Sequence, residues 1–221
     1  DQFAGGLSAE LLPENIYQQG RIVIVDFPIK EFGIAGIYAA TIYKTTFQAA
    51  MERRDVETEA NPKPIGLWID EYQQFCTHKT DSQFQATARS SWVATVYITQ
   101  NINNIFYVMG SDQPEAKAKS LLGNLNLKYF ASNDNYDTNV WASNMIGKHM
   151  VDFQNLNISK DMEISKSKNQ HLQFRVSPDH FTFLKTGRKA NNYIVETIVF
   201  KSGKTWGKDN QNFALVRFDQ R

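Results

Sequence analysis

Four short apolar blocks, separated by longer stretches of helical character, constrain the fold of this chain more than any other feature of its sequence. The blocks are RIVIVDF at 21–27, IGLWIDE at 65–71, VATVYIT at 93–99 and LKYFAS at 127–132. Each is apolar almost throughout instead of alternating with polar residues, which is typical of strands that are buried on both faces of a parallel sheet. We therefore expect four strands of one central sheet.

The stretches between these blocks have the features of helices. Residues 34–54 contain no proline, carry apolar residues at helical spacing and end in cations, which the helix dipole favours there. Further helices are expected at 81–91, 114–122 and 137–147, the last with Gly147 as its C-terminal cap. Because strands alternate with helices, the pattern predicts an α/β sandwich with a mainly parallel central sheet. In such sheets the chemistry gathers at the carboxyl ends of the strands.

The C-terminal part has a different pattern. Residues 151–170 are polar and rich in Ser, Lys and Asn, so we expect a mobile connection there. A short capped helix is expected at 177–187, where Ser177 precedes a proline. The segments 192–200 and 213–218 flank turn residues and predict antiparallel strands that close the domain.

Composition argues against several classes of site and of segment. Cys76 is the only cysteine, which excludes an internal disulfide and a site with several thiolates. The four histidines lack the spacing of a helical zinc motif, so no transition metal is expected. The apolar blocks are far shorter than the roughly 20 residues of a membrane-spanning helix. The chain begins at Asp1 instead of Met, and we expect it to be a piece of a longer protein.

Charge is distributed unevenly along the chain. Residues 1–158 contain 12 basic and 17 acidic residues, whereas residues 159–221 contain 12 basic and 6 acidic residues. The basic C-terminal part is compatible with a surface that faces phosphates, and equally with an ordinary solvated face, because its cations are scattered.

The strongest signal for chemistry is GLWIDEY, an apolar strand that ends in Asp70 and Glu71. In P-loop nucleotide hydrolases a strand of this kind is the Walker B element. One acid at its tip holds Mg²⁺, directly or through water, and the adjacent carboxylate orients the water that attacks the γ-phosphate. The alternative is a strand that ends in two solvated acids.

A second polar tip follows the next strand. VATVYIT leads into Gln100 and Asn101, which we expect at the same edge of the sheet as Asp70 and Glu71. A glutamine there can hydrogen-bond the γ-phosphate or the attacking water and report hydrolysis to the rest of the protein. The alternative is a cap for the helix that begins NINNIFYVMG.

The order of these segments resembles one family. GRIVIVDFP, a long helix, PIGLWIDEYQQF, a helix with ARSS, VATVYITQNINNIFYVMG and SLLGNLNLKYFASNDNYDTNVWASNMIGK follow one another as in the TraG/TraD-type coupling proteins of conjugation and type IV secretion. The resemblance covers about residues 20–148, and residues 177–187 resemble the closing segment of the family more loosely.

This resemblance implies a RecA-like three-layer sandwich, of which residues 1–150 are the second half of the ATPase motor domain and residues 151–221 its closing segment with a C-terminal hairpin. It implies a cytoplasmic domain of a protein anchored in the inner membrane and a homo-oligomeric ring, expected to be a hexamer. The ring hydrolyses ATP with Mg²⁺ at subunit boundaries. It pumps single-stranded DNA, with relaxase and relaxosome proteins as partners, towards the components of a type IV secretion channel.

The resemblance also implies roles for four residues. Asp70 binds the nucleotide through Mg²⁺, by way of water, and Glu71 is the catalytic carboxylate. Gln100 is the sensor. Arg89 matches an arginine of the family pattern and is a candidate finger that reaches the phosphate of a neighbouring subunit, since a guanidinium neutralises charge in the transition state. The alternative for Arg89 is a surface ion pair.

One element of the family pattern does not occur. The sequence has no G-x-x-x-x-G-K-[ST] phosphate loop, because Gly147 and Lys148 are followed by histidine. We therefore expect the half of the motor domain that carries the loop to lie upstream, and the isolated chain neither to bind ATP tightly nor to hydrolyse it. Two alternatives remain open: a related ATPase for assembly of a secretion system, and a non-catalytic module that recognises substrate or relaxosome proteins.

Overall fold

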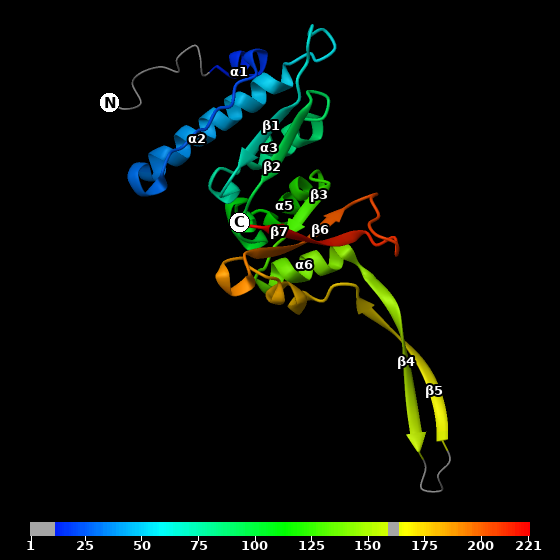
Figure 1. Ribbon diagram of the computed structural model, residues 1–221. Coiled ribbons are helices and arrows are strands. Elements are labelled where there is room, and N and C mark those ends of the chain that lie inside the picture. Colours follow the sequence, from blue (N-terminus) through cyan, green and yellow to red (C-terminus); the bar gives the residue numbers. More distant parts are fainter. Residues whose placement is uncertain (1–11, 159–163) are drawn as a thin grey trace. The chain divides into compact units, whose positions relative to one another are not determined.

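The computed structural model describes residues 12–158 and 164–221, and the chain divides into two compact units, Asp1–Leu125 and Asn126–Arg221. Each unit has its own strands (Figure 1), and each has its own apolar core. The division lies earlier in the chain than residue 150, where the sequence analysis places the end of the motor half. The functional assignment of 1–150 and 151–221 stays a prediction.

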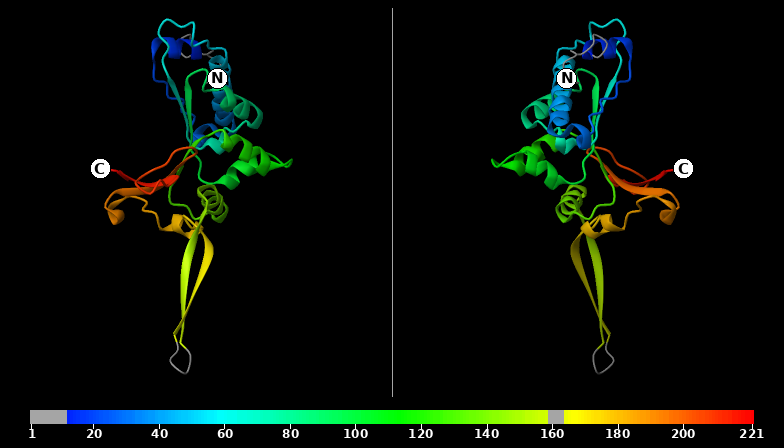
Figure 2. Two further views of the ribbon diagram at one scale, coloured as in Figure 1. Left: turned by 90° about the vertical axis from the view of Figure 1, so that its right-hand side faces the viewer. Right: turned by 90° about the vertical axis from the view of Figure 1, so that its left-hand side faces the viewer.

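A parallel pair of strands forms the centre of the first unit. β1 (Ile65–Ile69) and β2 (Val93–Tyr97) pair residue for residue along their whole length. Two of the expected strands and their parallel direction are thereby confirmed. The helices α2 (Ile29–Glu52) and α3 (His78–Thr87) lie on one side of the pair (Figure 2).

Two apolar clusters hold these elements together. The first joins β2 to α2 and α3 and consists of Phe47, Ala50, Met51, Phe84, Ala88 and Val93. The end of β1 packs against the 3-10 helix η2 (Tyr72–Gln74), α4 (Ile102–Val108) and α5 (Pro114–Gly123). This second cluster consists of Ile69, Tyr72, Ile105, Met109, Ala118 and Leu121. Because apolar burial stabilises a fold by about 25 cal/mol per Å², these clusters hold the end of β1 against the segment that follows β2.

The first apolar block, 21–27, does not form the strand that its sequence predicts. It is an extended, irregular segment between α1 (Pro13–Gln19) and α2, and the side chains of Ile22 and Ile24 are 94% and 87% exposed. β-Branched residues favour an extended backbone, but a strand also needs a neighbour for its backbone hydrogen bonds. No strand within 12–158 and 164–221 pairs with this segment, so the prediction of a buried strand is wrong here.

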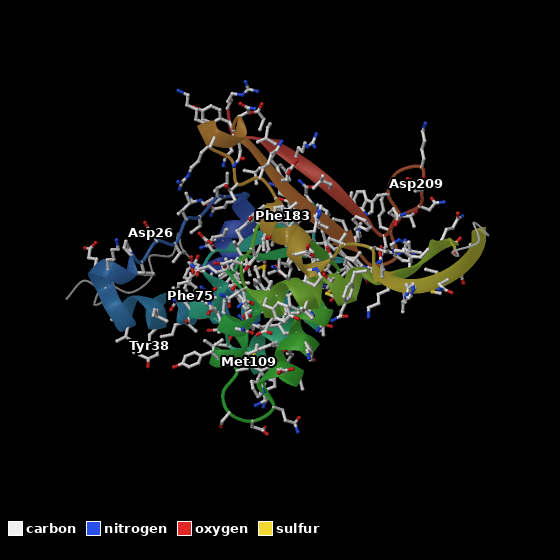
Figure 3. The ribbon with its side chains drawn as sticks, turned by 90° about the horizontal axis from the view of Figure 1, so that it is seen from below. Asp26, Tyr38, Phe75, Met109, Phe183 and Asp209 are labelled. Atoms are coloured by element: carbon white, nitrogen blue, oxygen red, sulfur yellow. The ribbon has the colours of Figure 1, made fainter. Side chains whose placement is uncertain are left out.

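Helix α2 is broken near its start. Gly33 has φ 55° and ψ −137°, a conformation that glycine adopts without steric cost. The regular part of the helix begins where the sequence predicts it, at residue 34, but α2 ends at Glu52, so the expectation that Arg53 and Arg54 form its last turn is wrong. The apolar residues Ile34, Tyr38 and Ile42 are exposed, and Tyr38 projects from the helix (Figure 3). The buried side of α2 therefore lies towards its C-terminal half.

Antiparallel strands form the sheet of the second unit. The strand order is β3 (Leu127–Phe130), β6 (Ile194–Lys201) and β7 (Phe213–Asp219). The antiparallel strands expected at the C-terminal end are confirmed, since β6 and β7 pair along seven residues. The direction expected for the fourth apolar block is wrong, because β3 pairs with β6 in the antiparallel sense. A run of apolar residues predicts a strand but carries no information on the direction of its partner.

Helix α6 (Tyr136–Ile146) covers one face of this sheet. It begins after Asn135, whose side chain accepts a hydrogen bond from the Thr138 amide at 2.9 Å, and it ends at Gly147, as the sequence predicts. The short capped helix expected at 177–187 is the shorter 3-10 helix η3 (Pro178–Phe183), and the Ser177 side chain makes no capping hydrogen bond to it; η4 (Lys189–Asn191) follows. The core of the unit consists of Phe130, Ala142, Ile146, Val176, Phe181, Leu184, Ile198 and Phe200.

The segment 151–170, expected to be a mobile connection, belongs to a long antiparallel hairpin instead. β4 (Lys148–Ile158) pairs with β5 (Ile164–Phe174) over eleven residues, and Figure 1 shows both strands. A two-stranded ribbon exposes both of its faces to water, so its strands need no apolar side, and polar residues are compatible with them. Polarity alone therefore led to the wrong prediction. Residues 159–163 of this segment lie outside the described residues.

No helix within 12–158 and 164–221 combines the length and the apolar character that a membrane span requires. The same part of the chain contains no group of three or more His, Cys, Asp or Glu side chains that could by itself hold a metal ion.

Candidate active site

The two acids of the predicted Walker B element lie directly after β1. Asp70 is exposed, and its Oδ1 accepts a hydrogen bond from the Glu71 amide at 2.9 Å. Glu71 is partly buried and has φ 47° and ψ 42°, which is the left-handed conformation. Asp70 therefore closes a turn that directs the chain from β1 into η2.

Gln100 lies three residues after the end of β2, beside Glu71. Its Nε2 donates to Oε1 of Glu71 at 3.1 Å and to Oε2 at 3.4 Å. Gln73 also donates its side-chain amide to Oε2 of Glu71. The structure thus brings together Glu71 and Gln100, which are 29 residues apart in the sequence.

Backbone bonds connect the two strand tips beyond the ends of β1 and β2. The Ile98 amide donates to the Ile69 carbonyl at 2.9 Å, and the Tyr72 amide donates to the Ile98 carbonyl at 2.8 Å. Thr99 Oγ1 donates to Oε1 of Gln73 at 2.8 Å. These contacts fix the backbone of the turn that carries Glu71 against the backbone that leads to Gln100.

A shallow depression of about 280 Å³ lies beside these side chains. Its lining residues are Glu71, Gln73, Gln74, Gln100, Asn104, Tyr107 and Val108. The amide, phenol and carboxylate groups among them can hold a polar ligand or a water molecule next to Glu71. Phe75, which is labelled in Figure 3, follows η2 directly.

The residues fit a magnesium ion that is held mainly by its nucleotide. Mg²⁺ in nucleotide hydrolases is bound through one or two carboxylates and completes its octahedral shell with water and phosphate oxygens. Asp70 provides one exposed carboxylate at the strand tip, and one carboxylate is enough for an ion whose other ligands are water and phosphate oxygens.

Arg89 lies away from this group. It is exposed in the turn between α3 and β2, whereas Gln100 follows the other end of β2. A strand of five residues therefore separates Arg89 from Glu71 of the same chain. The structure does not bring them together within one subunit. The role of Arg89 as a finger towards a neighbouring subunit stays a prediction.

Asn101 is a helix cap, which the sequence analysis gave as the alternative to a sensor for the polar residues after β2. Its side chain caps α4 by accepting a hydrogen bond from the Asn104 amide at 2.8 Å. Gln100, one residue earlier, contacts Glu71. The capping function and the contact with the carboxylate are therefore divided between two neighbouring residues.

Comparison with known families identifies the group to which the chain is related. Residues 64–181, more than half of the chain, match the family described as the TraM recognition site of TraD and TraG. The chain belongs to this family. A search of curated proteins found no match.

Solved structures show the same fold as this TraD/TraG family member. The unbound monoclinic form of the bacterial conjugative coupling protein TrwB, lacking its N-terminal 70 residues, has a TM-score of 0.64 at 15% identity. The TM-scores are 0.62 for TrwB with an ATP analogue that cannot be hydrolysed and 0.61 for TrwB with ADP and Mg²⁺. These alignments cover 87% of this chain and 38% or 39% of TrwB. The likeness confirms the expected α/β fold class, and this chain matches only part of the TrwB fold.

A buried polar network lies beneath the turn of the TraD/TraG family member, and the sequence analysis missed it. Asp81 on α3 is fully buried and accepts hydrogen bonds from Lys44 on α2 at 2.6 and 2.7 Å. It also accepts hydrogen bonds from Gln48, Tyr72 and the Thr77 amide, at 2.8 to 2.9 Å. A lysine and an aspartate on two different helices carry no local signal that they will meet, because the contact spans 37 residues.

Burial determines the electrostatics of this network. It lowers the pKa of Lys44, and the charge of Asp81 opposes that shift. Burial also raises the pKa of Tyr72 and of Tyr97, and the negative charge of Asp81 adds to both shifts. Both phenols therefore stay protonated, so the Tyr72 hydroxyl is available as a donor to Asp81.

Proposed function

We propose that the chain is part of an ATP-driven coupling protein that moves single-stranded DNA and bound relaxase into a type IV secretion channel. The contact between the Gln100 amide and the Glu71 carboxylate carries this proposal, because these are the two side chains proposed as sensor and as catalytic carboxylate, and they meet at one edge of a parallel pair. Membership of the TraD and TraG family and the fold shared with TrwB, which was solved with an ATP analogue and with ADP and Mg²⁺, support it.

In this proposal, Glu71 acts on the water that attacks the γ-phosphate. Its carboxylate accepts from two side-chain amides, so its oxygens are already held in a fixed orientation beside an open depression. Bound Mg-ATP supplies the phosphate and the metal that neutralises its charge. Asp70 would be the residue that holds the metal, and the Gln100 amide, which now contacts Glu71, would be free to donate to the phosphate or the water and so report the state of the nucleotide.

We propose that residues outside this chain hold the phosphates, because the given sequence contains no phosphate loop. We accordingly propose that residues 1–150 complete a motor domain and that residues 151–221 close it. The solved relatives are longer, because this chain spans about two fifths of TrwB. The protein would act as a homo-oligomeric ring, expected to be a hexamer, on the cytoplasmic side of the inner membrane, with Arg89 reaching the nucleotide of the adjacent subunit.

A second function, recognition of relaxosome proteins, is favoured by the family itself. Its description names recognition of TraM, and the match extends beyond the first unit into β4, β5 and η3. We propose that the second unit contributes to a surface that binds a relaxosome protein. This function is compatible with hydrolysis in the first unit, because one protein can recruit a substrate and then move it.

The test of the proposed hydrolysis is steady-state ATP turnover by the full-length protein, with and without single-stranded DNA. Glu71→Gln removes the charge of the candidate catalytic carboxylate while keeping its size. Glu57→Gln is the matched control, because Glu57 is an exposed acid in the loop before β1. We expect Glu71→Gln to lose turnover by at least 100-fold and Glu57→Gln to retain it. Equal turnover in both variants would refute the assignment.

A further inference from the structure

The backbone conformation of Glu71 needs support from its surroundings. Its φ of 47° lies in the left-handed region, which residues with a β-carbon rarely adopt. Such conformations persist at functional sites when neighbouring contacts determine them fully. The contacts of Asp70 and Gln73 with Glu71 belong to the turn itself, and the backbone bonds join the turn only to the end of β2, so its connection to α2 and α3 comes from the side chains that follow Glu71.

Tyr72, the residue after Glu71, provides the connection to the core. Its side chain is fully buried, and its hydroxyl donates to Oδ2 of Asp81 at 2.9 Å. Its ring stacks on the ring of Tyr97 with centroids 3.9 Å apart and planes within 5° of parallel. Tyr97 ends β2, three residues before Gln100, so one stacked pair joins the two strand tips.

Asp81 is the centre of this support. Its buried carboxylate accepts hydrogen bonds from two groups of the segment 72–77, which follows Glu71. These groups are the hydroxyl of Tyr72 and the backbone amide of Thr77. Lys44 adds two contacts to the turn, because its Nζ donates to the Phe75 carbonyl at 2.6 Å and to Thr77 Oγ1 at 2.9 Å. The segment 72–77 is thereby attached to α2 and α3 at its beginning and at its end.

We propose that Lys44, Tyr72 and Asp81 are positioning residues that hold Glu71 in its left-handed conformation next to Gln100. Buried ion pairs are weak contributors to net stability, because desolvation offsets the attraction between the charges. A fully hydrogen-bonded network does, however, favour one geometry over others. This inference rests on the proposed role of Glu71, and its own evidence is the geometry of the turn.

Tyr72→Phe is the sharpest perturbation of the network. It removes the hydroxyl and keeps the ring that stacks on Tyr97. Arg54→Met is the matched control in the same unit. The Arg54 side chain is 1% exposed and binds Glu59 at 2.6 Å and the Ser91 carbonyl at 3.2 Å, before β2 begins. The control therefore removes a buried cation that lies away from the strand tips.

The first measurement is amide hydrogen exchange in the 221-residue chain, which needs no nucleotide. Tyr72→Phe is expected to speed exchange of the Tyr72 and Ile98 amides at least tenfold relative to amides in α2. Arg54→Met is expected to leave unchanged the ratio between the exchange rates of these two amides and those of the amides in α2. If the two variants change the ratio equally, or if neither changes it, the network does not position the turn and the inference is overturned.

The second measurement is ATP turnover by the full-length protein. Because displacement of a catalytic group by about 1 Å costs on the order of 100-fold, Tyr72→Phe is expected to lower kcat roughly tenfold or more without changing KM for ATP. Arg54→Met is expected to retain kcat. Loss of turnover in Glu71→Gln but not in Tyr72→Phe overturns the positioning role and leaves the proposed function standing. Full turnover in Glu71→Gln refutes the proposed function, and the exchange measurement then decides the positioning role alone.

Discussion

Replacement of Lys44 by methionine removes the buried ion pair with Asp81 but keeps the other hydrogen bonds that Asp81 accepts. Lys44 is 5% exposed and Asp81 is fully buried, so the aspartate cannot turn to water once its cation is removed. Methionine fills most of the volume of the lysine stem without replacing its ammonium group. After the change Asp81 retains the donors Gln48, Tyr72 and the Thr77 amide, and the Phe75 carbonyl loses its bond to Nζ.

The expected loss of unfolding free energy is large. Removal of one partner from a buried pair costs about 3–5 kcal/mol, because the other charge stays buried without compensation. For a chain of this size each kcal/mol lowers the melting temperature by about 2–4 °C, so a decrease of about 6–20 °C is expected. Lys79→Met, which changes an exposed lysine on α3, is the control and is expected to shift the melting temperature by less than about 2 °C.

The assay is thermal and urea unfolding followed by circular dichroism and by tryptophan fluorescence. The double variant Lys44→Met/Asp81→Leu discriminates between a network and an isolated pair. An isolated pair can be replaced by apolar residues without loss of stability. Here Asp81→Leu removes the acceptor of Tyr72 and Thr77, so the double variant is expected to stay destabilised. A wild-type melting temperature in either variant would refute the reasoning.

Three further predictions concern other parts of the chain. Ile24→Asn is expected to change stability by less than about 0.5 kcal/mol, because the side chain is 87% exposed; a loss above about 2 kcal/mol in urea unfolding would indicate a buried strand. Burial raises the pKa of Glu196, but the Lys185 amide and Arg217 outweigh it and hold the pKa below its usual value of 4.5. The ionised carboxylate therefore stabilises the fold above that value, and the stabilisation is lost as the pH falls through the lower, folded-state pKa. Between pH 5 and pH 2 the free energy of unfolding should fall less in Glu196→Gln than in the wild type. An equal fall in both proteins would contradict this assignment. Gln100→Ala in the full-length protein is expected to lower ATP turnover about 100-fold at unchanged ATP affinity; unchanged turnover would exclude its role.

Periodicity and residue type identified those parts of the fold that depend on local information. The strands at 65–69 and 93–97 were predictable because apolar β-branched residues favour buried strands, and α6 was predictable because Gly147 ends it. The polar residues after two parallel strands also allowed Gln100 and Glu71 to be placed at the same edge of the sheet, where the structure shows them in contact. Parallel strands place their carboxyl ends at one edge of a sheet, so this inference needed no distant information.

Features that depend on a distant partner were not predictable in the same way. Residues 21–27 have the composition of a strand, but no strand of the described chain pairs with them. β3 pairs with β6, which lies more than sixty residues later, and its direction is set by that partner. The β4 and β5 hairpin was missed for another reason, because its two strands are neighbours in the sequence but their polar residues do not indicate strands. Lys44 on α2 contacts Asp81 on α3, and neither helix has a sequence pattern that indicates a buried charge.

The central claim, that Glu71 acts in the chemical step of ATP hydrolysis, is tested most directly by single-turnover hydrolysis in the full-length protein. ATP binding and the rate of phosphate formation are measured separately for the wild type and for Glu71→Gln. We predict that the variant binds ATP with unchanged affinity and forms phosphate 100-fold to 10,000-fold more slowly, in the range of about 10²–10⁴ expected for a lost general base. Phosphate formation at the wild-type rate in Glu71→Gln would contradict the account.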